Sequence, residues 1–362
     1  MSQKYPVLIG DIGGTNVRFQ LMKISKDMNE PAELIEKIKI SPQNFPSLED
    51  AFESFLSKFK GTENYPLYAV VGIPGPVKNN EILGITNIFH WKNVKGEDIA
   101  KQTNIKQVIF LNDFTCCGYG IQTNLKLGED YIVLNKGEVT PGGGKTVIGP
   151  GTGLGMGYLV KDPSCEYYTI GSSEGGHQDF CPKNALYNEL REYTMKLLGQ
   201  DNLSIERVCC GQGLVPIYKF LREKEKDIKR DEELGKKIDE FNDMKNVDGY
   251  NKLNIDLVKK GLDGSCELCR KVLELFIEIF AEVCGDACLF SVPSNGLYLT
   301  GGLSVVLEPL ITGTPIFMKH FLNKDNFEYL LKTFPVYLVK NGDLGVLGAQ
   351  ECARRLIVKN EK

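Results

Sequence analysis

The segment VLIGDIGGTNVRFQLMKI, residues 7–24, places an aspartate, two glycines and a threonine between two strand-like runs. Glycines at such a turn permit positive φ angles and let backbone N–H groups face an anion without a Cβ in the way. Thr15 adds a hydroxyl donor. Asp11 would repel a phosphate but can hold the water shell of a Mg²⁺ ion. The turn therefore suits a metal-bound polyphosphate, whereas a plain hairpin would leave Asp11 and Thr15 without a role. Arg18, in the second run, is interpreted as a structural residue.

A second turn of the same design lies in KTVIGPGTGLGMGYLV, residues 145–160, and contains Thr152. Two common phosphate motifs fail here. GGGKT, residues 142–146, has Val139 where a P-loop needs its first glycine, and GPGTGLGMG does not fit G-x-G-x-x-G. The repeated strand–glycine–strand design indicates a duplication with two related halves. Together with the Thr300-Gly301-Gly302 turn, it predicts a nucleotide site.

Asp113 follows the apolar strand QVIFLNDF, residues 107–114, at the end where α/β sheets present their ligands. A carboxylate in that position can accept the proton of a ligand hydroxyl as a general base. The alternative is that Asp113 merely caps the next helix. Asn112 beside it carries an amide that both donates and accepts, which suits a ligand with several hydroxyl groups.

The elements that must position these residues alternate between strands and helices. Residues 6–24 predict two strands, and Ser47–Phe59 predicts a capped amphipathic helix. Tyr68–Val77 reads as a strand that ends in a Gly/Pro loop, and Gly296–Leu310 as strand, Gly-Gly turn and helix. This order predicts an α/β fold, and 362 residues predict two domains.

The composition excludes several classes of protein. A net charge of −4 and a pI near 5.7 argue against nucleic-acid or membrane partners. Eleven cysteines, an odd number, with no secretion signal predict reduced thiols and a cytoplasmic location. Cys266 and Cys269 form a C-x-x-C without a second pair, so no structural zinc is expected.

The longest apolar segment starts at Val272 and does not predict a membrane span. Acidic residues interrupt it at every fourth position and predict one solvent-exposed stripe on a buried helix; they are Glu274, Glu278, Glu282 and Asp286.

The ordered motifs GDIGGTNVR, LNDF, GPGTGLG, SEGGHQDF, ERVCCGQGL and TGGL resemble those of the bacterial-type ATP-dependent glucokinases, from about Val7 to Ala353. That family belongs to the actin-like/sugar kinase superfamily. The resemblance implies two ribonuclease-H-like α/β domains with a cleft between them that closes on nucleotide and sugar. It implies a small domain of residues 1–123, completed by a C-terminal helix within 340–362, and a large domain of residues 124–339.

Two features depart from related patterns. The ROK branch of sugar kinases follows its Gly-His with a cysteine-rich zinc cluster, but GGHQDFCPKN contains only Cys181, which disfavours that branch. The charged segment of residues 222–260 is longer than we expect of bacterial members. We interpret it as a solvated helical insertion, with a partner-binding arm as the alternative.

The resemblance also assigns site residues. Asp113 is the expected catalytic base. The sugar-binding residues are expected to be Gly75, Asn87, Asn112, Asp113, Glu174, His177 and Glu206. The ATP-binding residues are expected to be Gly10, Asp11, Ile12, Gly13, Gly14, Thr15 and Asn16 in the first phosphate loop, Gly151, Thr152 and Gly153 in the second, and Gly301 and Gly302 against the adenosine. Mg²⁺ is expected to bind Asp11 through water and to neutralise phosphate charge together with backbone amides, because neither loop contains a lysine.

The predicted activity is transfer of the γ-phosphate of ATP to the 6-hydroxyl of glucose, giving glucose 6-phosphate and ADP, the first step of glycolysis. Alternatives are another hexose such as mannose or glucosamine, or a different phosphate donor. A non-catalytic sugar or nucleotide sensor is a further alternative. It is disfavoured because the full catalytic set is present and only six residues precede Val7, too few for a DNA-binding module. A homodimer is expected from the family.

Overall fold

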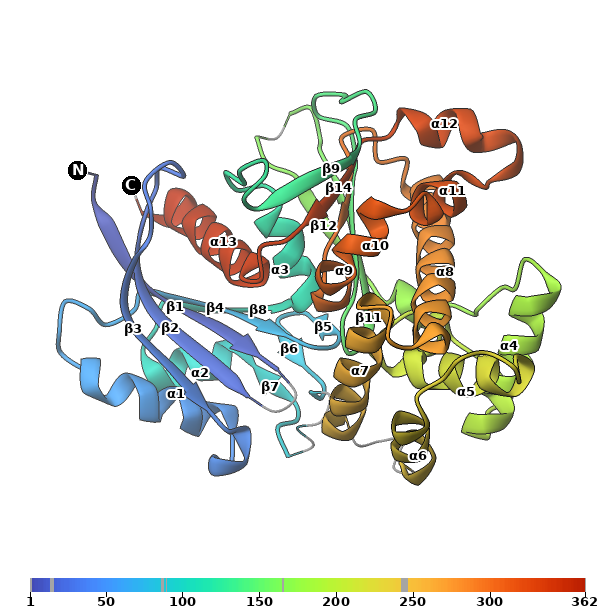
Figure 1. Cartoon of the computed structure of the whole chain (residues 1–362). Coiled ribbons are helices and arrows are strands. Elements are labelled where there is room, and N and C mark those ends of the chain that lie inside the picture. Colours follow the sequence, from blue (N-terminus) through green and yellow to red (C-terminus); the bar gives the residue numbers. More distant parts are fainter. Residues whose placement is uncertain are drawn as a thin grey trace. The chain divides into compact units, whose positions relative to one another are not determined.

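The computed structural model of the chain describes residues 2–13, 16–85, 88, 90–164, 166–241 and 247–361 (Figure 1). The chain forms two compact units. The first consists of Met1–Lys126, Ile170–Ser172 and Asn341–Lys362, and the second of Leu127–Thr169 and Ser173–Lys340.

The first unit is built on a five-stranded sheet with strand order β3-β2-β1-β4-β8. The strands are β1 (Lys4–Ile12), β2 (Val17–Ser25), β3 (Glu33–Ile40), β4 (Tyr68–Ile73) and β8 (Gln107–Asn112). The first three are antiparallel neighbours, and β4 and β8 run parallel to β1. Every residue of β4 is buried because helices cover both faces of the sheet.

Alternation along β1 sends neighbouring side chains to two separate cores. Leu8 packs toward α1 (Leu48–Leu56) and α2 (Gly96–Thr103). Val7 packs on the other face, toward α3 (Asp113–Gly120) and α13 (Leu344–Asn360). Figure 1 shows α13, in red, lying along this second face with α3. A small sheet of β5 (Val77–Lys78), β6 (Glu81–Ile82) and β7 (Val94–Lys95) completes the unit.

Helix α1 shows how local sequence determines an element. Ser47 is its N-cap, and the hydroxyl oxygen accepts from the backbone N–H of Asp50 at 3.0 Å. Phe52 and Phe55 lie against Phe19, with ring centroids 5.0 and 5.7 Å apart. The helix predicted from Ser47 is confirmed, and a 3₁₀ turn, Ser57–Phe59, continues it.

The second unit repeats the strand pattern of the first. Its sheet has the order β12-β11-β10-β13-β14-β9, and most of the edge strand β12 is the Ile170–Ser172 segment grouped above with the first unit. The strands are β9 (Tyr131–Asn135), β10 (Lys145–Pro150), β11 (Leu154–Val160), β12 (Thr169–Ser173), β13 (Leu297–Leu299) and β14 (Val336–Val339). As in the first unit, an antiparallel hairpin is followed by strands parallel to its first member. The predicted duplication is confirmed, and β9 adds an antiparallel edge.

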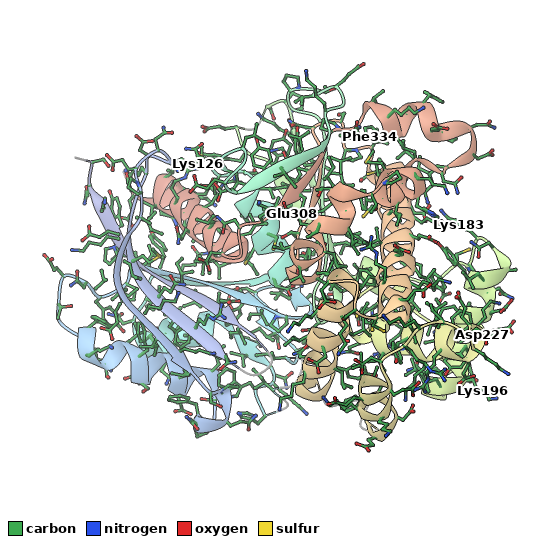
Figure 2. The ribbon with its side chains drawn as sticks, in the orientation of Figure 1. Lys126, Lys183, Lys196, Asp227, Glu308 and Phe334 are labelled. Atoms are coloured by element: carbon green, nitrogen blue, oxygen red, sulfur yellow. The ribbon has the colours of Figure 1, made fainter. Side chains whose placement is uncertain are left out.

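The helices of the second unit surround one long buried helix, α8 (Glu267–Ser291), which packs against α5, α7 and α11. The others are α4 (Ala185–Leu198), α5 (Leu214–Lys224), α6 (Glu232–Glu240), α7 (Val247–Leu262), α9 (Gly302–Val306), α10 (Glu308–Gly313), α11 (Ile316–Leu322) and α12 (Glu328–Thr333). Lys196 and Asp227, labelled in Figure 2, are exposed, whereas Phe334 is buried. Among the described helices, none is both long and apolar enough to cross a membrane.

The acidic stripe of α8 differs from its prediction. Glu282 is only 6% exposed, and its Oε1 lies 3.1 Å from His320 Nδ1. Lys183 Nζ lies 3.6 Å from the other carboxylate oxygen of Glu282, Oε2. The buried Lys324 donates to Asp286 Oδ1 at 2.5 Å and to the Glu282 carbonyl at 2.7 Å. The predicted solvent exposure is therefore wrong at Glu282, whereas Asp286 is exposed and Glu274 and Glu278 are partly exposed. A buried carboxylate needs partners, and Lys183 before α4 and His320 on α11 supply them.

Candidate active site

The carboxyl edge of the first unit's sheet brings two predicted site regions together. In the parallel register, Asp11 of β1 lies beside Gly72 of β4, and Gly72 lies beside Leu111 of β8. Asp113 begins α3 directly after β8. Since neighbouring strands are about 4.8 Å apart, the backbones at Asp11 and at the end of β8 are about 10 Å apart. The first phosphate loop and the predicted base thus share one edge.

Asn112, and not Asp113, caps α3. The Asn112 Oδ1 accepts from the backbone N–H groups of Phe114 at 2.9 Å and Thr115 at 3.2 Å. Its Nδ2 donates to the carbonyl of Gly75 at 3.2 Å. Gly75 has a φ of 118°, a conformation that requires glycine. The amide predicted to bind sugar therefore fixes the start of α3 and the loop after β4.

Asp113 is the first residue of α3, and its side chain is exposed. Its Oδ1 accepts from the backbone N–H of Phe114 at 2.9 Å. Asp113 therefore presents a carboxylate oxygen at the carboxyl edge of the sheet.

The first phosphate loop is described in part. Gly10, Asp11 and Ile12 end β1, and the Gly13 N–H donates to the carbonyl of Asn16 at 2.8 Å. A Cβ on Gly10 would lie 2.8 Å from a methyl carbon of Val71, so the neighbouring strand leaves no room for one. The predicted residues Gly14, Thr15 and Asn87 lie outside the described residues.

Arg18 and Asp343 set the electrostatics around Asp11. Arg18 is the cross-strand partner of Asp11, and its Nη1 lies 3.7 Å from Asp11 Oδ2. The pKa of Asp11 is raised, first by burial and also by the negative charge of Asp343, while Arg18 opposes the rise. The interpretation of Arg18 as merely structural missed this contact. The signal for it was the hairpin register, which places residues 11 and 18 opposite each other.

The second phosphate loop and the Thr-Gly-Gly turn meet at one edge of the second unit's sheet. Gly151–Gly153 follows β10, and Thr300–Gly302 follows its parallel neighbour β13. A Cβ on Gly149 would lie 2.3 Å from the Thr300 carbonyl oxygen. Gly301 has a φ of 88°, and a Cβ there would lie 2.6 Å from the Pro150 carbonyl oxygen. Both glycines are thus required by close backbone approach.

The predicted sugar residues of the second unit converge near Leu154. Glu174 follows β12, and the His177 N–H donates to its carbonyl at 2.9 Å, closing a tight 3₁₀ turn. Both side chains are exposed. A Cβ on Gly176 would lie 2.1 Å from the Leu154 carbonyl oxygen, so this turn folds directly over Leu154.

Glu206 reaches Leu154 from another segment. Its Oε2 accepts from the Leu154 N–H at 2.9 Å. A Cβ on Gly153 would lie 2.4 Å from the same oxygen, so the second phosphate loop passes against this carboxylate. Glu206 is therefore a loop contact as well as a candidate sugar ligand.

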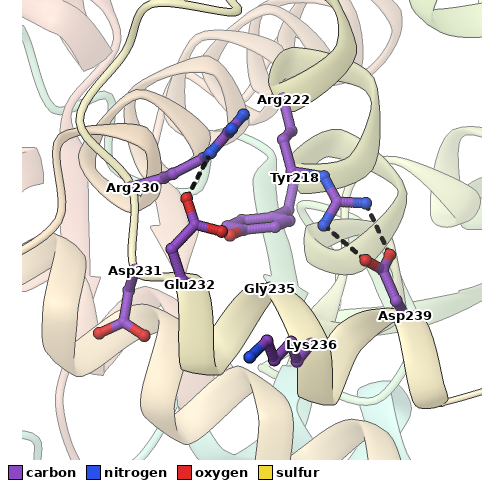
Figure 3. A pocket seen from close by; sticks show the side chains of 8 residues that line it. All are labelled: Tyr218, Arg222, Arg230, Asp231, Glu232, Gly235, Lys236 and Asp239. Carbon is purple, nitrogen blue, oxygen red and sulfur yellow. Dashed lines mark hydrogen bonds and ion pairs between the residues drawn. The ribbon is translucent and has the colours of Figure 1, made fainter.

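A separate cavity of about 270 Å³ lies between α5 and α6, in the charged segment (Figure 3). It is lined by Tyr218, Arg222, Arg230, Asp231, Glu232, Gly235, Lys236 and Asp239, none of which is a predicted site residue. Arg222 makes two bonds to Asp239, at 2.6 and 3.0 Å, and Arg230 bonds Glu232 at 2.9 Å. These charges largely compensate one another. The helical character predicted for residues 222–260 is confirmed by α6 and α7.

Comparison with known proteins identifies the family. The glucokinase family profile matches residues 8–356. A glucokinase of Nostoc sp. is 33% identical over 354 residues, covering 97% of this chain and 99% of the relative. The chain belongs to the glucokinase family. A Synechocystis glucokinase is likewise 33% identical over 357 residues, covering 96% of this chain and 97% of its own. As a glucokinase, the chain is an ATP-dependent sugar kinase that phosphorylates glucose.

Solved structures agree on the fold. The crystal structure of glucokinase from an Antarctic psychrotroph has a TM-score of 0.75 at 23% identity and covers 97% of this chain and 99% of that one. Glucokinase from Balamuthia mandrillaris in complex with glucose has a TM-score of 0.73 at 19% identity, with coverages of 97% and 94%. The predicted two-domain, actin-like α/β fold and the family resemblance are confirmed.

Proposed function

We propose that this glucokinase transfers the γ-phosphate of ATP to the 6-hydroxyl of glucose with Asp113 as general base. The observation that carries the proposal is the placement of Asp113. Asp113 is the first residue of α3, and its exposed carboxylate lies at the sheet edge that also carries the first phosphate loop. In this step the carboxylate accepts the hydroxyl proton, the sugar oxygen bonds to phosphorus, and the bond from phosphorus to the ADP oxygen breaks.

The remaining predicted residues have distinct roles in this proposal. Glu174, His177 and Glu206 bind sugar hydroxyls, together with Asn87 and the Gly75 loop. The two glycine turns described above bind the phosphates through backbone N–H groups, and Gly301-Gly302 lies against the adenosine. Asn112 acts chiefly by holding Asp113 in place, since its amide oxygen is engaged at the start of α3.

Mg²⁺ is the proposed metal. Asp11 and Asp343 offer carboxylate oxygens, the ligands that Mg²⁺ prefers. Burial raises the pKa of Asp11, and the negative charge of Asp343 adds to the rise while Arg18 opposes it. A cation held there, through water at Asp11, would offset the negative charge of the two carboxylates. When bound, it would neutralise charge on the transferred phosphoryl group.

A cytoplasmic location and a homodimer complete the proposal. In the described part of the chain the cysteines are free thiols, most of them buried, which suits a reducing compartment. The homodimer rests on the family expectation. A monomeric mass by light scattering would contradict it.

The central test is a steady-state screen of glucose, mannose, glucosamine and fructose against ATP, ADP and polyphosphate. We expect the highest kcat/KM with glucose and ATP. Asp113→Asn should lower kcat about 10²- to 10⁴-fold, the usual contribution of a general base, while glucose binding stays detectable by calorimetry. Asp98→Asn, exposed on α2, is the matched control. A preference for another sugar or donor would overturn the substrate assignment, and a normal kcat in Asp113→Asn would remove Asp113 from the role.

A further inference from the structure

Asn254 is a buried amide on α7 that takes part in none of the roles above. It is 9% exposed. Its Nδ2 donates to the carbonyl oxygen of Gly211 at 2.7 Å. Gly211 opens a 3₁₀ turn, Gly211–Gly213, that packs against α7. Since a buried polar side chain is costly unless it is bonded, this contact fixes the amide in one orientation.

The contact continues directly into the second phosphate loop. The Gly211 N–H donates to the Gly151 carbonyl at 2.9 Å, and the Gly151 N–H donates to the Gly153 carbonyl at 2.8 Å. A Cβ on Gly211 would lie 3.1 Å from the Gly151 oxygen and 3.4 Å from Asn254 Nδ2, so no side chain separates the helix from the loop. Asn254 thus holds the loop through a single intervening residue.

The other end of the amide is unsatisfied. Asn254 Oδ1 is buried and has no hydrogen-bond partner in the described part of the chain. A flipped amide, with the oxygen and nitrogen exchanged, would not provide more hydrogen bonds. It would turn the side-chain oxygen toward the Gly211 carbonyl oxygen, which is also an acceptor. A buried acceptor without a donor costs free energy, so this oxygen retains the capacity to accept one further hydrogen bond.

We propose that Asn254 is a nucleotide-binding residue of this enzyme: it positions the second phosphate loop through Gly211, and its Oδ1 accepts a hydrogen bond from the nucleoside part of ATP. The proposal rests on the proposed role of Gly151–Gly153 in binding phosphates. Ionised phosphate oxygens carry no proton, so they cannot fill this acceptor. The donors of ATP are the ribose hydroxyls and the amino group of adenine, and either source has the required chemistry.

The test pairs residue changes with nucleotide changes. Initial rates are measured with ATP, 2′-deoxyATP, 3′-deoxyATP and inosine triphosphate for the wild-type enzyme, Asn254→Ala and Asn254→Asp. Asn251→Ala, on the exposed side of the same helix, is the matched control. Thermal unfolding of each variant confirms that it is folded. Asn254→Asp removes the donor to Gly211 but keeps an acceptor.

In the wild-type enzyme, one analogue that lacks a donor should have a KM about 3- to 10-fold above that of ATP, the range for one hydrogen bond. In Asn254→Ala, the KM for ATP should rise at least as much, the KM for glucose should stay unchanged, and the penalty for that analogue should disappear. A purely structural residue would not remove a penalty specific to one group of the nucleotide. Loss of the penalty with a deoxynucleotide identifies the ribose as the donor, and loss with inosine triphosphate identifies the base.

Three results would overturn the inference. The first is a wild-type enzyme that uses ATP and all three analogues equally well, and this result does not depend on any variant being folded. The second is a penalty that persists in Asn254→Ala. The third is an effect of Asn254→Ala on the KM for glucose alone. A wild-type chain that phosphorylates no hexose with ATP would instead refute the proposed function, so the two failures are distinguishable.

Discussion

Helix α13 crosses α3 at Gly348, and this crossing governs the placement of Asp113. A Cβ on Gly348 would lie 1.7 Å from the Cys116 carbonyl oxygen and 2.8 Å from the Gly120 nitrogen. Both atoms belong to the backbone of α3, so neither can rotate away. Gly348→Ala must therefore push apart the two helices, and α3 carries the proposed base at its first residue.

The size of the effect follows from these distances. A carbon and a carbonyl oxygen approach to about 3.3 Å, so the helices must separate by about 1.6 Å at this point. Overpacking of this kind costs about 1–3 kcal/mol, and the clash with backbone favours the upper end. Alanine is a better helix former than glycine by about 1 kcal/mol, which offsets part of this cost. We expect a net loss of about 2 kcal/mol in the free energy of unfolding. A displacement near 1 Å at the base should also lower kcat about 10²-fold.

Gly345→Ala is the matched control, because it lies on the same helix and a Cβ there would meet nothing within 4 Å. Urea unfolding and kcat with saturating glucose and ATP are measured for both variants. The control should keep the wild-type kcat and be at least as stable as the wild type. If Gly348→Ala unfolds at the wild-type urea concentration and keeps its kcat, the close crossing does not position Asp113.

Three further outcomes are expected. Gly301→Ala should raise the KM for ATP about 10-fold and leave the KM for glucose unchanged. A loss of about 1.4 kcal/mol in binding free energy corresponds to a tenfold weaker affinity. Equal effects on the two KM values would show that Gly301 does not lie at the nucleotide. Burial raises the pKa of the Cys352 thiol to about 12. The folded state therefore keeps a proton that the unfolded state loses above about pH 8.5, so stability falls as pH rises. Between pH 8.5 and 10, the unfolding free energy of Cys352→Ala should fall by about 1.5 kcal/mol less than that of the wild type, and parallel urea-denaturation curves across that range would contradict this. Chelation of Mg²⁺ should abolish turnover. Asp11→Asn should raise the Mg²⁺ concentration that gives the half-maximal rate about 10-fold, and Asp98→Asn should leave that concentration unchanged.

Local patterns predicted the parts of this enzyme that depend on neighbouring residues. The two strand–glycine–strand turns were predictable because a turn and its two strands are contiguous in the sequence. Ser47 predicted the start of α1 because an N-cap bonds a backbone N–H only three residues away. The position of Asp113 at a strand end was predictable for the same reason. The strand pairing of the second unit followed from its likeness to the first.

Contacts between distant segments were not predictable from such patterns. The exposure expected for Glu282 was wrong because its partners, Lys183 and His320, are contributed by segments before and after α8. The hydrogen bond from the Asn112 amide to the Gly75 carbonyl was not predictable, because nothing local in the sequence reveals it. The same holds for Asn254, whose importance depends on Gly211 and the loop beyond it.

The C-terminal helix has a consequence for how the protein is made. α13 covers the sheet face that includes Val7 and Ile9, and Glu361 accepts from the Tyr68 hydroxyl at 2.6 Å and from Lys106 at 2.7 Å. The sheet of the first unit is therefore completed by a helix that is translated well after its strands. Until α13 has been translated this apolar face stays uncovered, and exposed apolar surface of this kind makes a folding intermediate prone to aggregate. Deletion of α13 alone would keep Asp11 and Asp113 in the chain but leave the sheet beneath them without its cover.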